Sequence, residues 1–417
     1  MNVLVIGGGV VGVTTAYYLS KAGMDVTVVD GNEAAGLETS AGNAGLFSPS
    51  DAFAWASPSA LKIAVQSFIN PDMGIKYKLR LDPALWRWSL AFLNQCRYGS
   101  WEINSDAKFR LASFSLEMLH DLRRDTGIDF DAGDEGIAYA CRDENTLAAL
   151  KKHFSFLESR GLELELLDRD GLIEKVPALK ANPQTYVGAV YSPTCKTGDS
   201  KKFSQNLAKW CQQNNNCEFI WGARVEKVLA DGNTITGVLT SKGVYKADAY
   251  VLAAGPQSGI LARQVGLKLP IYPIKGFSIT APIIDNTLIP SIGFDDTDRL
   301  VAMSRFGNRL RIASSAVFGG FDNSHQPKDF KAILTLAREL FPDAIEYEKV
   351  EYWSGLRPMT PSSKPIIGAT PISNLFLNTG HGHLGWTMSC ATGKVVADIV
   401  AGETPDTETA PFELDCV

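Results

Sequence analysis

The chain has 417 residues, a formal net charge of −6, 45% hydrophobic residues and 21% charged residues. This length is typical of two or three domains with a large core, and the composition is ordinary for a soluble globular protein. The acidic balance gives no electrostatic support for binding to nucleic acid.

The cysteine, histidine and hydropathy patterns argue against a disulfide framework, a metal site and a transmembrane helix. Seven cysteines are scattered without a C-x-x-C pair, and none of the five histidines stands at metal-ligand spacing from a cysteine. We therefore expect reduced thiols in a cytoplasmic setting and no metal site. The chain contains no run of 18 apolar residues, so we expect no transmembrane helix.

The first thirty residues carry a specific pattern. A short apolar strand runs into G-x-G-x-x-G as Gly7, Gly9 and Gly12, a helix is expected over residues 14–22, and a second apolar strand ends at Asp30. Glycines allow a tight turn and a close approach of backbone to a pyrophosphate, and the acid accepts hydrogen bonds from a ribose. Because all the parts fall in order, the stretch predicts dinucleotide binding and not a chance glycine-rich turn.

A loop of small residues follows, Thr39-Ser40-Ala41-Gly42-Asn43-Ala44-Gly45. Its hydroxyls, amide and glycines suit a backbone that wraps a phosphate or a polar ring edge. A flexible surface loop would have the same composition. Its position just after the acid favours contact with the cofactor.

Residues 48–101 have the pattern of helices rich in tryptophan. Leu61, Ala64, Val65 and Phe68 have the spacing of an amphipathic helix, and Asp82-Pro83 predicts the start of a helix over residues 84–96. Four of the eight tryptophans lie in this segment: Trp55, Trp86, Trp88 and Trp101. They could fill the core of a cap domain, which we favour because exposed apolar patches are uncommon, or form a surface for a membrane or a quinone.

Residues 105–195 alternate between helix and strand without a second nucleotide fingerprint, which indicates a separate α+β substrate domain. Helices are expected at 105–125 and 145–160, and strands at 128–130, 136–141 and 163–167.

The chain is expected to return to the first domain near residue 197. A helix at 203–213 precedes short strands at 218–221, 224–229, 234–240 and 243–246. A buried strand at 248–253 then ends in Ala254-Gly255-Pro256, where small residues let the backbone pass close to a nucleotide.

Residues 271–345 are again rich in strands. Arg305, Arg309 and Arg311 cluster around a predicted hairpin turn, and we expect at least two of them to be solvated flanks. A helix is expected at 328–341, and the segment 353–358 is expected to be irregular.

A second strand–glycine-loop–helix unit lies near the C-terminus. An apolar strand at 375–378 runs into Gly380-His381-Gly382-His383-Leu384-Gly385-Trp386, and a helix is expected at 387–400. A nicotinamide enzyme needs only one glycine-rich helix N-terminus. A flavin enzyme uses two, one for the pyrophosphate and one whose N–H groups and dipole stabilise negative charge on the reduced ring.

These segments together resemble a known family. The fingerprint, the Thr39-Ser40 loop, the Ala253-Ala254-Gly255 strand end and GHGHLGW are similar to the glycine oxidase, sarcosine oxidase and D-amino-acid oxidase superfamily of FAD enzymes. LETSAGNAG, Ser48-Pro49, Tyr272-Pro273-Ile274-Lys275-Gly276, WSGLRPMTP and NTGHGHLGWTM more closely resemble the bacterial D-amino acid dehydrogenase small subunit, over essentially the whole chain.

The resemblance implies an α/β FAD-binding Rossmann-like domain and an α+β substrate domain with a mixed or antiparallel sheet. We expect the first from residues 1–50, 196–262 and 354–417, and the second, a cap, from 51–195 and 263–353. The implied activity is oxidation of D-amino acids to 2-oxo acids and ammonia, by hydride transfer from Cα to N5 of noncovalent FAD. Electrons would pass to a quinone or another respiratory acceptor, and the protein would be cytoplasmic, with peripheral contact at the cytoplasmic face of the inner membrane.

Site residues follow from the motifs and the resemblance. Arg357 is expected to anchor the substrate carboxylate, with Arg311 as a second candidate, although Arg357 could instead form a structural bridge between domains. His381 could tune the flavin or the amine proton, or could simply pack beside the ring. The expected cofactor contacts are Gly7, Gly9, Val10, Val11, Gly12, Asp30, Thr39, Ser40, Asn43, Ala44, Gly45, Val225, Ala253, Gly255, Gly380, Gly382, Leu384, Gly385, Trp386 and Thr387.

The chain also departs from the family pattern. Ser50-Asp51 stands where the family commonly shows Gly-Tyr, Ser362-Ser363-Lys364 where it shows Asp-Gly and a variable residue, and His383 replaces a small residue. The first departure could border the active site, which leaves the preferred side chain open. Two other functions share the motifs: a D-proline or D-hydroxyproline dehydrogenase, and a flavin subunit that relays electrons without its own substrate.

Overall fold

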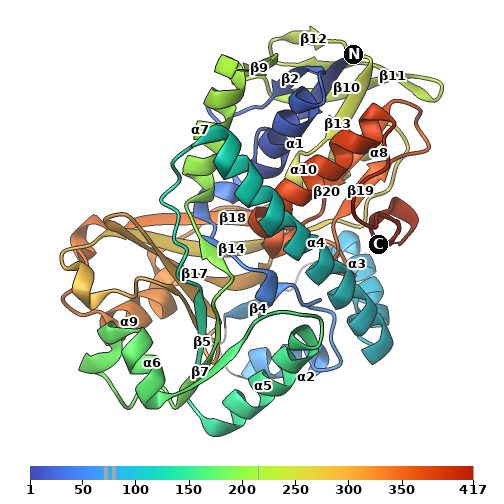
Figure 1. Ribbon diagram of the computed structural model, residues 1–417. Coiled ribbons are helices and arrows are strands. Elements are labelled where there is room, and N and C mark those ends of the chain that lie inside the picture. Colours follow the sequence, from blue (N-terminus) through green and yellow to red (C-terminus); the bar gives the residue numbers. More distant parts are fainter. Residues whose placement is uncertain (70–73, 78–80, 215, 417) are drawn as a thin grey trace.

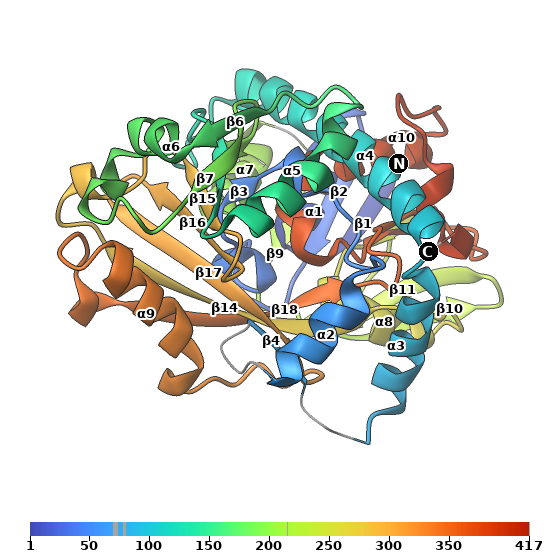
Figure 2. The same cartoon turned by 90° about the horizontal axis from the view of Figure 1, so that it is seen from below.

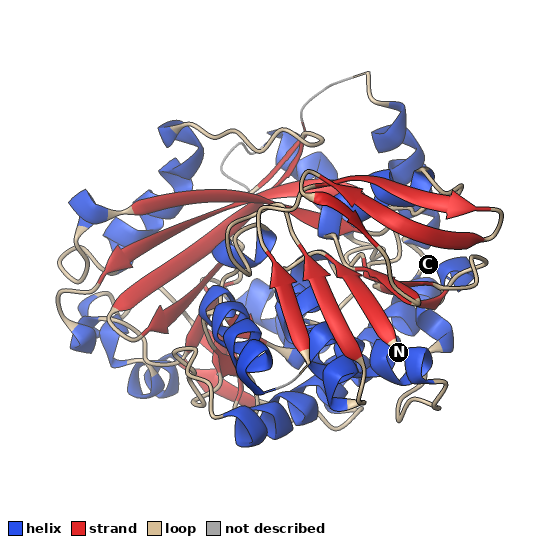
Figure 3. Cartoon of the chain, turned by 90° about the horizontal axis from the view of Figure 1, so that it is seen from above, coloured by secondary structure: helices blue, strands red, loops and turns tan. Residues whose placement is uncertain are grey.

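The structure, a computed structural model, describes residues 1–69, 74–77, 81–214 and 216–416, and of residues 66, 68 and 69 only the backbone. Two large sheets dominate it (Figure 1). Figure 3, with strands in red, shows the long strands of the larger sheet running beside the shorter strands of the smaller one. The fold therefore combines a nucleotide-binding type of sheet with a second, mixed sheet.

The smaller sheet has the order β19-β20-β13-β1-β2-β9. Its strands are β1 (Asn2–Ile6), β2 (Asp25–Val29), β9 (Cys217–Ile220), β13 (Ala249–Leu252), β20 (Leu375–Thr379) and β19 (Ile366–Ala369), and only β19 runs antiparallel to its neighbour. Chain segments from both ends and the middle of the sequence thus meet in one mainly parallel sheet, as expected for strands that are continuous apolar runs.

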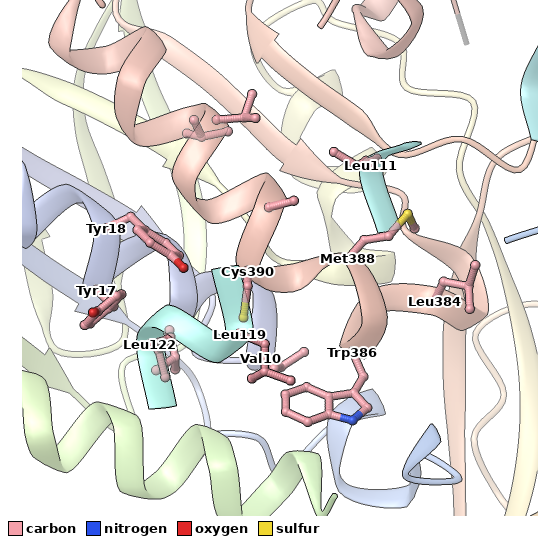
Figure 4. Packing of buried hydrophobic residues seen from close by; sticks show 14 of the residues in the cluster. Val10, Tyr17, Tyr18, Leu111, Leu119, Leu122, Leu384, Trp386, Met388 and Cys390 are labelled. Carbon is pink, nitrogen blue, oxygen red and sulfur yellow. The ribbon is translucent and has the colours of Figure 1, made fainter. Parts of the chain in front are cut away.

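Helices cover one face of this sheet, and a small sheet covers the other. The helices are α1 (Val10–Lys21), α4 (Tyr98–Thr126), α7 (Ser200–Asn214) and α10 (Gly385–Ala401), and the small sheet consists of β10 (Val225–Asp231), β11 (Thr234–Thr240) and β12 (Gly243–Tyr245). Figure 4 shows Tyr18 of α1, Leu119 of α4 and Cys390 of α10 in one buried cluster. Both faces of the smaller sheet are therefore covered by packed elements.

The larger sheet has the order β18-β14-β17-β16-β15-β5-β7-β6, and β4 pairs with β17. Its strands are β4 (Ile75–Tyr77), β5 (Ile137–Cys141), β6 (Glu165–Asp168), β7 (Gly188–Ser192), β14 (Tyr272–Pro282), β15 (Gly293–Asp296), β16 (Val301–Phe306), β17 (Arg309–Phe318) and β18 (Glu351–Met359). Most pairs are antiparallel, while β15–β5 and β17–β4 are parallel. The remaining helices are α2 (Ala60–Ile69), α3 (Pro83–Gln95), α5 (Glu144–Glu158), α6 (Arg169–Lys175), α8 (Ser258–Arg263) and α9 (Lys331–Leu340), and a two-stranded ribbon pairs β3 (Leu46–Phe47) with β8 (Lys196–Thr197).

Two predictions about secondary structure were wrong. The segment 353–358 is not irregular, because it forms the centre of β18. Residues 128–130 are not a strand, since the turn after α4 occupies them. The predicted domain boundary at 353/354 falls inside β18, which belongs to the larger sheet.

The tryptophan segment is part core and part surface. Trp88 and Trp101 are buried, whereas Trp86 is 58% exposed. Large apolar side chains gather in the same segment and are exposed, namely Leu61, Val65, Leu81, Leu90, Leu93, Tyr98 and Ile103. The expected amphipathic helix forms as α2, although the side chain of Phe68 lies outside the described residues. Within the described ranges, no helix combines the length and hydropathy that crossing a membrane would require.

Gly393 lets α10 approach α1. A Cβ added there would lie 2.9 Å from the carbonyl carbon of Thr14 and 3.0 Å from its oxygen. We expect Gly393→Ala to lower the free energy of unfolding by about 1–3 kcal/mol, because overpacking forces backbone shifts. Unfolding of the purified protein followed by circular dichroism measures this. The control is Gly99→Ala in α4, where an added Cβ meets no atom within 4 Å; equal destabilisation by both variants would contradict the packing argument.

Candidate functional site

A continuous cavity of about 1410 Å³ extends along the ends of the smaller sheet and over the face of the larger one. Residues beside both sheets line it, among them Gly7 and Asp30 next to the smaller sheet and Phe154 and Thr297 next to the larger one. Ligands of parallel α/β sheets bind outside the carboxyl ends of the strands, and this cavity occupies that position.

Glycines shape the turn between β1 and α1. Gly7 has φ +113°, a conformation that side chains disfavour, and an added Cβ would lie 2.9 Å from the carbonyl carbon of Ala253. Gly12 does not line the cavity: a Cβ there would collide with the carbonyl oxygen of Gly7. Gly12 therefore allows helix and strand to pack closely, whereas Gly7 and Gly9 border the cavity.

The N-terminus of α1 opens into the cavity. The N-cap residue is Gly9, which provides no side-chain cap, and the amide of Val10 donates to Ser40 Oγ at 3.1 Å. Helix N-termini of this kind bind phosphate through free N–H groups and the helix dipole. The first turn of α1 therefore fits a pyrophosphate.

Asp30 ends β2 at the cavity wall. Its Oδ2 accepts a hydrogen bond from the amide of Gly8 at 2.6 Å, and its Oδ1 accepts from the backbone and side-chain nitrogens of Asn32, both at 2.8 Å. These bonds fix the carboxylate beside the glycine turn. This arrangement fits a ribose whose hydroxyls donate to the carboxylate.

The loop 39–45 connects the two sheets. Thr39 Oγ1 donates to the carbonyl oxygen of Leu356 in β18 at 2.6 Å, and Ser200 Oγ donates to the carbonyl oxygen of Ser40 at 2.7 Å. Asn43 Oδ1 accepts from the amide of Gly45 at 2.7 Å. The loop is thus held from β18, from α7 and by its own side chain.

Arg311 of β17 binds the backbone of this loop. Its Nη1 donates to the carbonyl oxygens of Ala41 at 2.8 Å and Asn43 at 3.0 Å, and its Nε donates to Thr280 Oγ1 at 2.6 Å. The side chain is buried, and burial lowers its pKa to about 10. Arg311 is absent from the cavity lining, so its contacts favour a positioning role over contact with substrate. Arg309, by contrast, is half-exposed and pairs with Asp131 and Asp199.

The second glycine loop precedes α10. Gly380 and Gly382 have φ of +76° and +61°, and residues Gly382–Leu384 form a short 3₁₀ turn. His381 points toward α10, with its Nε2 3.1 Å from Thr392 Oγ1, and burial lowers its pKa to about 3. The ring is therefore neutral at pH 7. Its bond to Thr392 favours packing over proton transfer.

Arg357 lines the cavity from β18. Its Nη1 donates to the carbonyl oxygen of Ser315 at 2.6 Å, and a Cβ on Gly276 would lie 2.5 Å from Nη2. Within the described ranges, no carboxylate lies within 4.0 Å of the guanidinium. Burial alone lowers its pKa to about 10. Among the described residues, Arg357 thus has no ion-pair partner at the cavity wall.

Irregular backbone makes room for Arg357. The pairing of β14 with β17 shifts register between Lys275 and Phe277, next to Gly276. In β17, Ser315 has φ +77°, which non-glycine residues seldom adopt. Bulges and strained residues of this kind are frequent at functional sites, where they aim a side chain.

Most of the expected cofactor contacts border the cavity. Lining residues are Gly7, Gly9, Val10, Val11, Asp30, Thr39, Ser40, Asn43, Ala44, Val225, Ala253, Gly255, Gly382, Leu384, Gly385 and Trp386, together with His381 and Arg357. Gly12, Gly45, Gly380 and Thr387 lie behind this surface. Thr387 still contacts the site's framework, because its Oγ1 accepts from the amide of Ser48 at 3.1 Å.

Sequence reasoning missed the far wall of the cavity. Phe53, Tyr139, His153, Phe154 and Asp295 all line it. None belongs to a recognisable motif, since β5, α5 and β15 meet only in the folded sheet. Asp51 and His383 also line it, and their departure from the family pattern was the one available signal.

Comparisons with known proteins agree with this arrangement. The model of the family described as "FAD dependent oxidoreductase" matches residues 2–399. The chain is 45% identical over 406 residues to D-amino acid dehydrogenase 2 of Mesorhizobium japonicum, covering 97% of this chain and 98% of the relative. It is 42% identical over 403 residues to D-amino acid dehydrogenase of Paramagnetospirillum magneticum, covering 96% and 95%.

Solved structures show the same fold. Glycine oxidase of Geobacillus kaustophilus superposes with a TM-score of 0.75 at 24% identity, covering 99% of this chain and 97% of that one. L-proline dehydrogenase of P. horikoshii has a TM-score of 0.74 at 19% identity, covering 99% and 96%. With the family model spanning nearly the whole chain and the glycine turn, Asp30 and the second glycine loop bordering one cavity, this chain belongs to the FAD-dependent oxidoreductase family.

Proposed function

We propose that the protein oxidises D-amino acids to 2-oxo acids and ammonia with noncovalently bound FAD. The observation that supports it most directly is Arg357, a guanidinium without a carboxylate partner in the described structure, on the wall of the cavity that the cofactor-type loops border. A planar guanidinium binds a carboxylate through two parallel hydrogen bonds, which fixes orientation as well as position. The names of two relatives, both D-amino acid dehydrogenases, agree with this chemistry.

The residues of the chain would bind and orient the substrate. FAD, when bound, supplies the two-electron oxidant at the reacting Cα–H. Arg357 holds the carboxylate, so the position of Cα is fixed whichever side chain follows. The aromatic side chain of Trp353, on the same strand as Arg357, lines the cavity and would exclude water from the amine. The amine must be neutral to be oxidised, and the imine product can be hydrolysed after release.

We further propose a quinone-type electron acceptor reached through peripheral contact with a membrane. The exposed apolar side chains of residues 61–103 support this, and Trp86 and Leu93 also line the cavity mouth. Exposed Lys62, Arg87 and Arg97 lie in the same segment, where they would attract anionic lipid despite the acidic net charge. The proposal includes a cytoplasmic location, with contact at the inner face of the membrane.

A second candidate is an imino-acid dehydrogenase for D-proline or D-hydroxyproline, which would use the same arginine. A flavin subunit that relays electrons without its own substrate is the third. A cavity this large beside an arginine without a carboxylate partner favours a substrate site over a relay. Anaerobic addition of single D-amino acids, including D-proline, to the purified protein separates these candidates by whether and how fast the flavin absorbance bleaches.

Asp30→Ala tests the cofactor assignment. Loss of a charge-assisted contact to the ribose should weaken FAD binding by about 1.5–3 kcal/mol. The measurement is flavin retention during dialysis, with fluorescence titration of the stripped protein and chromatography of the flavin released by denaturation. Asp231→Ala, an exposed carboxylate in the β10–β11 turn, is the control. Release of FMN or NAD instead of FAD, or flavin that stays attached after denaturation, would contradict noncovalent FAD.

Arg357→Lys and Arg357→Ala test the carboxylate anchor. We expect FAD content and thermal stability to stay close to those of the unmodified protein. We also expect kcat/KM for D-amino acids to fall by about 2–4 kcal/mol, since the substrate carboxylate loses its partner. Steady-state kinetics with an artificial electron acceptor measures this. Loss of FAD or of stability, with little change in catalysis per remaining flavin, would instead identify Arg357 as a structural bridge.

Vesicle flotation tests the membrane contact. The exposed residues Val65 and Leu90 carry the apolar surface of α2 and α3 without lining the cavity. We expect Val65→Gln combined with Leu90→Gln to reduce binding to anionic vesicles and to slow quinone reduction severalfold. Val244→Gln combined with Ile284→Gln, which removes equally exposed apolar side chains elsewhere, should leave both unchanged. Absence of binding by the unmodified protein would reject the proposal.

A further inference from the structure

The carboxylates that line the cavity outside the motifs include Asp51, in the short turn after β3, and Asp295, in β15. Asp51 Oδ2 accepts a hydrogen bond from Ser48 Oγ at 2.8 Å, and Asp295 Oδ1 accepts one from Thr297 Oγ1 at 3.2 Å. Among the residues whose structure is described, no lysine, arginine or histidine nitrogen lies within 4.0 Å of either carboxylate. Two acids thus face the cavity without an ion pair.

The walls around these acids are mainly aromatic. Trp55 stacks on His383 with ring centroids 4.8 Å apart. The ring centroids of Phe53 and His153 are 3.6 Å apart. Tyr139 also lines this part of the cavity. Aromatic faces accommodate both a hydrocarbon stem and a cation, so the surface suits an aliphatic chain with a charged end.

One protein cation interacts with the charge of Asp51 but does not line the cavity. Lys108 of α4 is fully buried, is absent from the cavity lining, and donates to the carbonyl oxygen of Phe53 at 2.5 Å. Burial lowers the pKa of Lys108 to about 7. Burial also raises the pKa values of Asp51 and Asp295, and the charge of Asp51 raises that of Asp295 further. A cation entering the cavity would relieve this repulsion.

The acids lie away from Arg357. Arg357 lies in β18, and three strands, β14, β17 and β16, separate β18 from β15, which carries Asp295. Asp51 is linked through Ser48 Oγ to the hydroxyl of Tyr139 in β5, the strand beyond β15. In a substrate anchored by its carboxylate, the α-amine is attached one carbon away and must stay close to the guanidinium. Asp51 and Asp295 therefore face the far end of the side chain and not the α-amine.

We infer that Asp51 and Asp295 form a subsite for a cationic side chain, so that the enzyme selects basic D-amino acids such as D-lysine and D-ornithine over neutral ones. This inference rests on the proposed function, because it assigns the side-chain end of the same cavity. The carboxylates bind the terminal ammonium group, while the aromatic rings cover the methylene chain.

The first test needs no variant. Flavin reduction and kcat/KM are measured for D-lysine, Nε-acetyl-D-lysine and D-norleucine. D-lysine should exceed D-norleucine at least tenfold in kcat/KM, and acetylation, which removes the charge, should abolish the advantage. D-norleucine equal to or better than D-lysine would overturn the subsite while leaving the proposed function intact. If no D-amino acid reduces the flavin, the proposed function itself fails.

Variants test whether Asp51 and Asp295 cause the preference for basic D-amino acids. Asp51→Asn and Asp295→Asn should each lower the ratio of kcat/KM for D-lysine to that for D-norleucine at least tenfold, and Asp295→Glu should restore most of it. The matched control is Asp298→Asn, because Asp298 is exposed, lies outside the cavity and binds the amide of Arg142. An equal loss for both substrates, or an unchanged ratio in FAD-containing Asp51→Asn and Asp295→Asn proteins, would overturn the assignment.

Discussion

The close approach of three backbone segments at Gly7 is the constraint on which the cofactor half of the molecule depends. Gly7 turns with positive φ against the end of β13, where the backbone of Ala253 leaves no room for a side chain on Gly7. The carbonyl oxygen of Gly7 in turn leaves no room for a side chain on Gly12. This contact sets where α1 begins. The amides of its first turn, the carboxylate of Asp30 and the strand end at Ala253 consequently face one cavity.

Hydrogen bonds extend this constraint to the larger sheet. The loop 39–45 leaves the cofactor half, but Thr39 is bonded to Leu356 of β18 and Arg311 of β17 binds two of its carbonyl oxygens. Arg357 lies one residue beyond Leu356 on the same strand. The position of loop 39–45 relative to Arg357 is therefore set by a few short hydrogen bonds. Precision of this kind is what orientation-dependent catalysis requires.

The sequence predicted those parts of the site whose residues are neighbours in the chain. The nucleotide turn and the second glycine loop combine an apolar strand, glycines and a helix within about thirty residues, a pattern typical of dinucleotide-binding units. The prediction of irregular chain at 353–358 was wrong for a physical reason. Gly355 and Pro358 suggest irregular chain, but β18 is the outermost strand of its sheet, where proline is tolerated. Asp295 and Tyr139 could not be predicted, because their position depends on the parallel pairing of β15 with β5 and the antiparallel pairing of β5 with β7.

Positive and negative side chains lie at different places along the cavity wall. One site could therefore bind both the carboxylate and a cationic side chain of the same substrate. In the part of the chain that the structure describes, Arg357 has no carboxylate partner at the β18 wall, while Asp51 and Asp295 line the cavity near β5 and β15. Unpaired charges in a buried wall cost folding free energy unless a ligand compensates them, so a fold that retains both signs at separate places has a reason other than stability. A zwitterionic substrate that carries a further cation would compensate both ends at once. The ring of His383, packed on Trp55 between these groups, has its pKa held well below the usual value by burial and by the charges of Lys108 and Arg357. It therefore stays neutral and adds no further charge to the cavity.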